Sequence, residues 1–245
     1  MSFAGHTIVV TGGAGGLGSA IARAFADAEG DVVIADLDAA AGQRVADDIG
    51  TAARYLPLDV TEEASWMSLL DSVDEQLGGL NVLVNNAGFY APNIPFEEMP
   101  IELWRKHFAI NSDGVFLGCK HGILRMKSRG GAIVNLGSTM SIQANPTGSA
   151  YCGSKAAVLM TTRTAAKSAG QYNIRVNAVL PGAVPTAMLM GNIREGETEA
   201  DLIERLRGRS PLDRLATPND IATAVLFLAD PSNTAITGSC LPVDG

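Results

Sequence analysis

The sequence predicts a single α/β domain built on a parallel β-sheet. Short runs rich in β-branched residues alternate along the chain with longer stretches of helical periodicity, and such alternation is typical of parallel β-α-β units. The chain has 245 residues, of which 47% are hydrophobic, which is enough to bury a sizeable core in one domain. We therefore expect one α/β domain over residues 1–245, doubly wound, with helices on both faces of the sheet.

Each expected strand is a short β-rich run, separated from the next by a stretch of helical periodicity. The expected strands lie at residues 6–10, 31–35, 54–58, 80–85, 131–136, 174–180 and 239–243. A helix is expected over about 17–29. Thr61 and Thr217 stand where threonine can cap a helix. The longest interruption of the alternation, at about 183–217, is interpreted as a substrate lid, because long loops in compact domains are usually functional.

Composition excludes several kinds of partner. The net charge is −8, which argues against a broad basic surface, so we expect neither nucleic acid nor a membrane as a partner. Cys119, Cys152 and Cys240 lack any C-x-x-C spacing, which suggests reduced thiols and no metal site. No stretch has the length of a membrane span, and no signal segment opens the chain. We expect a cytoplasmic protein that acts on a small molecule.

A glycine-rich turn predicts a nucleotide site. The stretch TGGAGGLG, residues 11–18, follows the first strand and opens a helix, and such a turn can hold a phosphate on free N–H groups and the helix dipole. Asp36 ends the second strand, where a carboxylate can bind an adenosine ribose and repel a 2′-phosphate. The alternatives are an ordinary tight turn and a solvated aspartate. Together these residues predict NAD as the cofactor.

A second group of residues predicts acid–base chemistry. Tyr151 and Lys155 are four residues apart, so they share one face of a helix at about 5–6 Å. An ammonium stabilises a phenolate, and Lys155 is therefore expected to lower the pKa of Tyr151. Ser138 follows the strand at 131–136. Taken alone, a tyrosine–lysine pair on a helix is more often part of the surface.

These motifs resemble the short-chain dehydrogenase/reductase family. The resemblance rests on Thr11-Gly12-x-x-x-Gly16-x-Gly18, on Asn85-Asn86-Ala87-Gly88, and on Ser138 with Tyr151-x-x-x-Lys155. It implies a Rossmann-like fold with a seven-stranded sheet in the order 3-2-1-4-5-6-7. It also implies an oligomer, a homotetramer or else a homodimer, assembled through the helices that carry Asn111 and Tyr151.

The resemblance also implies roles for the site residues. Ser138 would hold the substrate oxygen, Tyr151 would exchange the proton, and Lys155 would bind the nicotinamide ribose. Asn111 would be a fourth catalytic member, in a helix distorted around a water that relays protons to Lys155. An ordinary polar residue in a helix is the alternative for Asn111. The residues expected to bind the cofactor are Thr11, Gly12, Gly16, Leu17, Gly18, Asp36, Asp59, Val60, Asn86, Ala87, Gly88, Tyr151, Lys155, Pro181, Gly182, Val184 and Thr186.

A substrate pocket is expected where three segments meet over the nicotinamide. Its expected residues are Phe89, Tyr90, Met140, Gln143, Asn145, Met188 and Leu189. Because these side chains are uncharged, they favour an apolar, cyclic or bulky secondary alcohol or its ketone. A carboxylate would find no cation there unless Arg194, Arg205 or Arg207 turned in. Alternatively, Met188 and Leu189 anchor the lid to the core.

The function predicted from these residues is that of an NAD-dependent alcohol dehydrogenase or ketone reductase. Two alternatives remain. A reductase of 3-oxoacyl thioesters fits the same framework, although such relatives usually prefer NADPH and offer basic residues to a carrier protein. A non-catalytic NAD-sensing protein would be expected to have lost part of the Ser138, Tyr151 and Lys155 set, and this sequence retains all three.

Overall fold

The computed structural model describes residues 1–208 and 210–245 and contains one seven-stranded sheet. The strand order is β3-β2-β1-β4-β5-β6-β7, and every neighbouring pair is parallel. The strands are β1 (Thr7–Thr11), β2 (Asp31–Asp36), β3 (Ala53–Pro57), β4 (Val82–Asn85), β5 (Gly131–Leu136), β6 (Ile174–Pro181) and β7 (Cys240–Val243). The predicted fold class is therefore confirmed, together with the strand order implied by the family resemblance.

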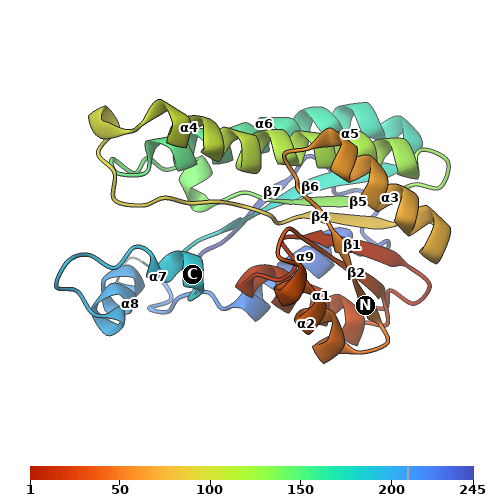
Figure 1. The fold of residues 1–245 in the computed structure, drawn as a ribbon, viewed down its shortest axis with the longest axis horizontal. Helices are drawn as coiled ribbons and strands as arrows, with labels where there is room; N and C mark the ends of the chain where they lie inside the picture. The colour runs from red at the N-terminus through yellow and green to blue at the C-terminus, as the bar shows by residue number, and fades with distance from the viewer. Residues whose placement is uncertain (209) are drawn as a thin grey trace.

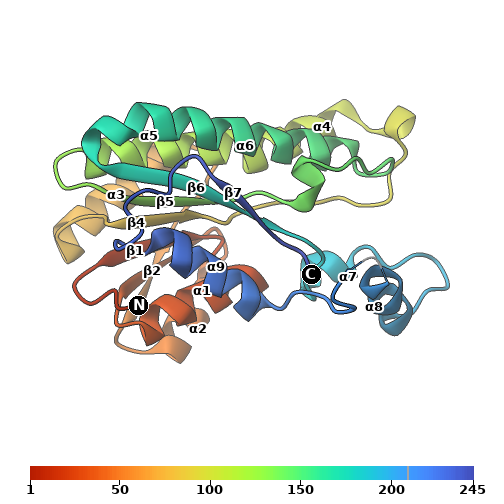
Figure 2. The ribbon, with the colours of Figure 1, turned by 180° about the vertical axis from the view of Figure 1, so that it is seen from behind.

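Helices cover both faces of this sheet (Figures 1 and 2). The helices are α1 (Gly16–Asp27), α2 (Ala39–Ile49), α3 (Glu63–Leu77), α4 (Ile101–Phe108), α5 (Gly114–Met126), α6 (Ser149–Ala169), α7 (Ala187–Met190), α8 (Glu199–Arg207) and α9 (Pro218–Ala229), with the shorter turns η1 (Phe96–Glu98), η2 (Ala109–Asp113), η3 (Thr139–Ser141) and η4 (Gly170–Tyr172). The layer with α1, α2 and α9 lies on one face, and the layer with α3, α4, α5 and α6 lies on the other. None of the described helices is both long and apolar enough to span a membrane.

Two apolar layers hold the helices to the sheet. Ile8 and Val10 of β1 belong to the core under α1 and α9, whereas Val9 belongs to the core under α3 and α5. Successive side chains of a strand point to opposite faces, and a strand covered on both faces must be apolar throughout. This explains why β1 is a continuous apolar run. The sheet is thereby fixed from both sides, and its carboxyl edge is left to the loops.

The two predicted threonine caps have different outcomes. Thr217 caps α9, accepting a hydrogen bond from the Asp220 N–H (3.2 Å), while the Asp220 carboxylate accepts one from the Thr217 N–H (2.8 Å). The prediction for Thr61 is wrong. Helix α3 begins at Glu63 with Glu62 as its cap residue, and the Thr61 hydroxyl instead donates to Asp59 Oδ1 (2.7 Å). The Asp59 carboxylate competes for this hydroxyl and closes the loop after β3.

The predicted lid segment lies beyond the carboxyl ends of β6 and β7. It carries the short helices α7 and α8, which stand apart from the two helical layers (Figures 1 and 2). Its final part is tied to the last residue, since the Leu212 N–H donates to the Gly245 carbonyl (2.7 Å). Residue 209 lies outside the described part of the chain. That this segment moves as a lid stays a prediction.

Candidate active site

A cavity of about 1260 Å³ lies at the carboxyl edge of the sheet. Segments that follow several different strands line it, including Gly12 after β1, Asn86 after β4 and Gly182 after β6. Ligands of open parallel sheets bind in such a crevice, because the connecting loops diverge at this edge. The cavity therefore lies where the sequence placed the nucleotide.

The glycine turn forms one wall of the cavity. Gly12 has φ +61°, and a Cβ added at Gly18 would lie 2.1 Å from the Gly12 carbonyl oxygen, so both positions require glycine. Helix α1 begins at Gly16 with no side-chain cap and no acidic residue in its first turn. Its first N–H groups and the positive end of its dipole are thus available to an anion. The turn fits the diphosphate of a dinucleotide.

Asp36 is fixed beside this turn. One carboxylate oxygen accepts a hydrogen bond from the Ala14 N–H (3.0 Å), and the other accepts one from the Asp38 N–H (3.0 Å). Asp36 lines the cavity together with Asp59 and Val60, which follow β3. Two backbone donors therefore hold the Asp36 carboxylate in place, and each oxygen keeps a lone pair for a further donor such as a ribose hydroxyl.

Thr11 does not line the cavity but supports its floor. Its buried hydroxyl oxygen accepts hydrogen bonds from the N–H groups of Asn86 and Ala87, both at 3.0 Å. The Asn86 side chain in turn donates to the carbonyls of Thr11 (2.8 Å) and Gly12 (3.1 Å). The direct cofactor contact predicted for Thr11 is not supported, because its hydroxyl is used to tie the end of β4 to the glycine turn.

Ser138, Tyr151 and Lys155 meet in the same cavity. Tyr151 and Lys155 lie on α6, and the Lys155 Nζ is 5.9 Å from the centre of the Tyr151 ring. The Lys155 ammonium donates to the Leu136 carbonyl at the end of β5 (2.7 Å). Ser138 stands two residues after β5, and its hydroxyl accepts a hydrogen bond from the Met140 N–H (3.1 Å). Helix α6 and β5 thus bring together three residues that the sequence separates.

Burial dominates the titration of this group. It raises the pKa of Tyr151 to about 12, although a hydrogen bond with Ser138 acts in the opposite direction. Burial also lowers the pKa of Lys155 to about 8. The expected lowering of the Tyr151 pKa by Lys155 is therefore not found in the protein alone, where burial raises this pKa and the ammonium donates to the Leu136 carbonyl. At neutral pH, Tyr151 carries its proton.

Asn111 lies in a distorted helix behind these residues. Residues Ala109–Asp113 form a π-helical turn between α4 and α5, which confirms the predicted distortion. The Asn111 side chain accepts a hydrogen bond from the Phe89 N–H (2.8 Å) and donates to the Phe89 carbonyl (2.9 Å) and the Ser154 hydroxyl (3.0 Å). It is fully buried and does not line the cavity. Its role in a proton relay stays a prediction.

Comparison with known proteins agrees with this geometry. A family model described as enoyl-(acyl carrier protein) reductase matches residues 12–245. Cis-4-hydroxycyclohexanecarboxylate dehydrogenase of Sinomonas cyclohexanicum is 38% identical, over 100% of this chain and 97% of that protein. The NADP-dependent (R)-specific alcohol dehydrogenase of Lentilactobacillus kefiri is 36% identical, over 98% of this chain and 96% of that protein.

A solved structure is similar over the whole chain. The 3-ketoacyl-(acyl-carrier-protein) reductase of Brucella melitensis, complexed with NADH, superposes with a TM-score of 0.93 at 30% identity and covers 100% of this chain and 98% of that one. The chain belongs to the short-chain dehydrogenase/reductase family. This short-chain dehydrogenase/reductase is an oxidoreductase that acts on CH–OH groups with a nicotinamide cofactor.

Most residues that the sequence assigned to the cofactor line the cavity of this short-chain dehydrogenase/reductase. They are Gly12, Gly16, Leu17, Gly18, Asp36, Asp59, Val60, Asn86, Ala87, Gly88, Tyr151, Lys155, Pro181, Gly182, Val184 and Thr186. Thr11 is the exception. No three His, Cys, Asp or Glu side chains among the described residues lie together as a metal ion would require.

The expected substrate residues meet at the other end of the cavity, with one correction. Tyr90, Met140, Gln143, Asn145, Met188 and Leu189 line it. Phe89 does not, because its ring packs against His107 with ring centres 4.9 Å apart, and the Lys106 Nζ lies 4.4 Å from its centre. The Tyr90 ring instead turns to Tyr151, with ring centres 4.6 Å apart. Successive side chains of this loop thus face opposite directions.

Sequence reasoning missed several further cavity residues. Lys106 and Ile110 come from α4 and η2, and Asn192, Leu202 and Leu206 come from the segment before α9. The position of Ile110 next to Asn111 was a usable signal, whereas the others depend on how the segments fold over the cavity. Arg194 and Arg205, which the sequence left as alternatives, both line the cavity, and Arg207 does not.

Proposed function

We propose that this protein is an NAD-dependent dehydrogenase that interconverts an apolar, ring-bearing secondary alcohol and its ketone. One observation carries the proposal: Ser138, Tyr151 and Lys155 line the same cavity as the glycine turn and Asp36. A dinucleotide that lies on the turn can therefore extend to the three residues that handle the substrate oxygen.

We also propose that the enzyme acts in the cytoplasm, which its free cysteines support.

The chain's own residues supply orientation and proton transfer. A bound nicotinamide provides the hydride acceptor or donor. The Ser138 hydroxyl would hold the substrate oxygen beside the Tyr151 phenol. In ketone reduction, the protonated Tyr151 would give its proton to that oxygen. In alcohol oxidation, a Tyr151 phenolate would accept the proton, and a charged Lys155 would stabilise it.

The choice of NAD over NADP is proposed from Asp36. The relative from Lentilactobacillus kefiri carries NADP in its name, so the choice must be argued from this chain. A 2′-phosphate placed against the fixed Asp36 carboxylate would cost on the order of a few kcal/mol at short range. We expect kcat/KM with NAD to exceed that with NADP by at least about a hundredfold.

The test compares the two cofactors in three proteins. Asp36→Ala should reduce the preference for NAD about tenfold or more, because the repulsion is removed. Asp27→Ala, at the end of α1 and outside the cavity lining, should leave it unchanged. Equal use of NAD and NADP by the wild-type enzyme would remove this role of Asp36.

The substrate class is proposed from the apolar side chains near Tyr151. Tyr90, Met140, Met188 and Leu189 line this end of the cavity, and burying hydrocarbon gains about 25 cal/mol per Å². The relative from Sinomonas cyclohexanicum acts by its name on a cyclohexane ring. We expect cyclohexanols or aromatic secondary alcohols to give higher kcat/KM than sugars or linear hydroxy acids at saturating NAD. A tenfold advantage for a sugar or a linear hydroxy acid would contradict the proposal.

Reduction of a 3-oxoacyl thioester is the second candidate. The similarity to the reductase of Brucella melitensis supports it, and that structure contains NADH. The net charge of −8 is against it, because an acidic carrier protein would be repelled. Assays with NADH and either acetoacetyl-coenzyme A or cyclohexanone separate the two candidates. Faster turnover of the thioester would favour the second candidate.

We propose that the enzyme assembles as a homotetramer, with a homodimer as the alternative. The helices that carry Tyr151 and follow Asn111 leave large apolar side chains exposed, namely Phe116 and Leu124 on α5 and Met160 on α6. Exposed apolar patches on soluble proteins commonly mark interfaces. A second copy of the chain would cover this face.

A further inference from the structure

Arg194 lines the cavity, and it follows Leu189 and Asn192, which also line it, in the same segment of the chain. Its side chain is exposed. Within residues 1–208 and 210–245, its guanidinium makes no hydrogen bond or ion pair. Only its backbone N–H is bound to a side chain, that of Glu197. A guanidinium offers five N–H donors in a fixed planar fork, a geometry that matches a carboxylate.

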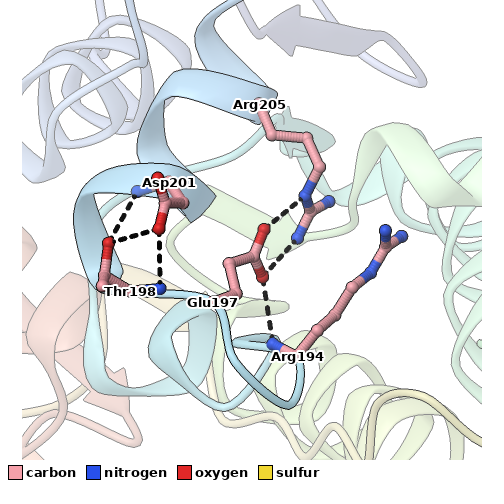
Figure 3. Close-up of polar contacts among 5 residues, drawn as sticks. All are labelled: Arg194, Glu197, Thr198, Asp201 and Arg205. Carbon is pink, nitrogen blue, oxygen red and sulfur yellow. Dashed lines mark hydrogen bonds and ion pairs between the residues drawn. The ribbon is translucent and has the colours of Figure 1, made fainter.

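Glu197 holds the backbone of Arg194 in place. The Arg194 N–H donates to Glu197 Oε2 (3.0 Å), and the Glu197 N–H donates to the Arg194 carbonyl (3.0 Å). Figure 3 shows that the Arg194 side chain nevertheless extends away from the Glu197 carboxylate. The base of the side chain is therefore fixed, while its charged end is left without a partner among the described residues.

The Glu197 carboxylate forms its ion pair with Arg205. Arg205 donates two hydrogen bonds to the Glu197 carboxylate, from Nε (2.7 Å) and Nη2 (3.1 Å), as Figure 3 shows. The hydrogen bond from Arg205, followed by that from the Arg194 backbone, lowers the pKa of Glu197 to about 2. Glu197 is thus ionised and paired at neutral pH, and the three residues together keep one positive charge, on Arg194.

The other cations of the cavity already have contacts. Lys155 donates to the Leu136 carbonyl, Arg205 pairs with Glu197, and Lys106 lies over the Phe89 ring. Four acidic residues line the cavity, Asp36, Asp38, Asp59 and Asp244, and none of them forms an ion pair with Arg194 in the described structure. In a chain of net charge −8, the cavity therefore retains a cation that no described residue neutralises.

We propose that Arg194 binds a carboxylate on the substrate, at the end of the molecule away from the reacting carbon. This inference rests on the proposed function and narrows its substrate class to ring alcohols with an anionic substituent. The ring would pack on Met188 and Leu189, which precede Arg194 in the same segment, while the alcohol carbon faces Tyr151. Arg194 then supplies the cation that the uncharged side chains of this pocket lack.

The test uses matched neutral and anionic substrates. Wild type and Arg194→Gln are assayed at saturating NAD with 3- and 4-hydroxycyclohexanecarboxylate and with the corresponding carboxamides. For the preferred acid, Arg194→Gln should lower kcat/KM at least about tenfold, mainly through KM, which corresponds to about 1.4 kcal/mol. The carboxamides should change less than twofold, and KM for NAD should not change. Arg194→Lys should retain part of the preference for the acid.

Arg207→Gln is the control for charge alone, since Arg207 lies on α8 outside the cavity lining. It should leave the preference for the acid unchanged. Equal losses on acid and amide in Arg194→Gln, or no preference for the acid in wild type, would overturn the inference. A rise in KM for NAD would overturn it too, because the anion would then be a cofactor phosphate. If wild type oxidises the amides well and the acids poorly, the proposed function stands and the Arg194 inference fails. If it oxidises none of them, both fail.

Discussion

Lys155 is buried and Tyr151 is half-buried in the wall of the cavity, and desolvation moves their pKa values in opposite directions. A phenol whose pKa is raised keeps its proton at neutral pH and gives it up less readily, whereas an ammonium whose pKa is lowered is held at a cost to folding. The same desolvation therefore keeps Tyr151 protonated and makes the charged form of Lys155 unfavourable.

Tyr151→Phe should separate binding from chemistry. The ring and its packing against Tyr90 remain, while the proton donor is lost, so kcat should fall at least about a hundredfold. NADH affinity, measured by the fluorescence of the bound cofactor, should change little. Full activity in this variant would exclude Tyr151 from proton transfer.

Lys155 predicts a distinctive pH dependence of stability. Its pKa falls from 10.5 to about 8 on folding, so between these pH values the unfolded chain binds more protons than the folded one, and stability rises with pH. Below pH 8 the full cost is present, on the order of 3 kcal/mol. In urea titrations between pH 7 and pH 10, the free energy of unfolding of wild type should therefore rise relative to that of Lys155→Met, by a few kcal/mol.

The matched control is Lys167→Met, which removes an exposed lysine from the same helix. Its free energy of unfolding should change with pH as that of wild type does over this range. If the free energy of unfolding of Lys155→Met had the same pH dependence as that of wild type, Lys155 would not be the group whose pKa falls on folding. Activity should be lost in Lys155→Met but not in Lys167→Met.

At the scale of elements, the π-helical turn connects the cavity to the layer behind it. Asn111 holds both backbone groups of Phe89 and the hydroxyl of Ser154 on α6. The extra residue of a π-turn turns a side chain toward partners that a regular helix would not reach. The loop that carries Gly88 and Tyr90 is thereby held against the helix of Tyr151 and Lys155.

Asn111→Ala should release this loop. It removes the hydrogen bonds of the Phe89 N–H and carbonyl to the Asn111 side chain, at a cost of up to about 1–3 kcal/mol for each group left unsatisfied. We expect a lower Tm and a higher KM for both NAD and substrate. Ser112→Ala, which removes a neighbouring hydrogen bond from the Ser112 hydroxyl to the Ser154 carbonyl (2.9 Å), should lower Tm without the same loss of KM. Matching kinetic effects in the two variants would show that general destabilisation, rather than the Phe89 contacts, is responsible.

At the scale of the whole molecule, helices α5 and α6 leave large apolar side chains exposed. The Phe116 side chain is 55% exposed and that of Met160 is 60% exposed, and they lie on helices that contact each other. A second copy that covered this face would bury these side chains and hold the helices behind Tyr151 and Asn111. Assembly would then stabilise the helices that carry the site residues, without adding a residue of the second copy to the cavity.

Light scattering tests this assembly. Wild type should have the mass of a tetramer, or of a dimer, at micromolar concentration. Phe116→Glu combined with Met160→Glu should shift the protein to smaller species, because two carboxylates would have to be desolvated in the interface. Met67→Glu, at an exposed position on α3, should not. A monomeric wild type would refute the proposed assembly.

The sequence by itself determined the fold, and most of the residues that it assigned to the site line the cavity. Its apolar runs fixed the strands of a parallel sheet covered on both faces, and parallel strands bring their carboxyl ends to one edge. The glycines at positions 12 and 18 are required by the backbone of the turn, and the four-residue spacing of Tyr151 and Lys155 fixes one helix face. These features are local, so the pattern of residues along the chain is enough to predict them.

The tertiary structure alone decided what each of these groups can do. The pKa values of Tyr151 and Lys155 depend on burial by distant elements, which the four-residue spacing on one helix does not reveal. Thr11 and Phe89 face away from the cavity because Asn86 and His107, far along the chain, offer them better contacts. Arg194 and Arg205 are both cations in sequence, but only the fold shows that Glu197 pairs with Arg205 and leaves the charge of Arg194 to the cavity. Desolvation and pairing act through space, and the sequence records only distance along the chain.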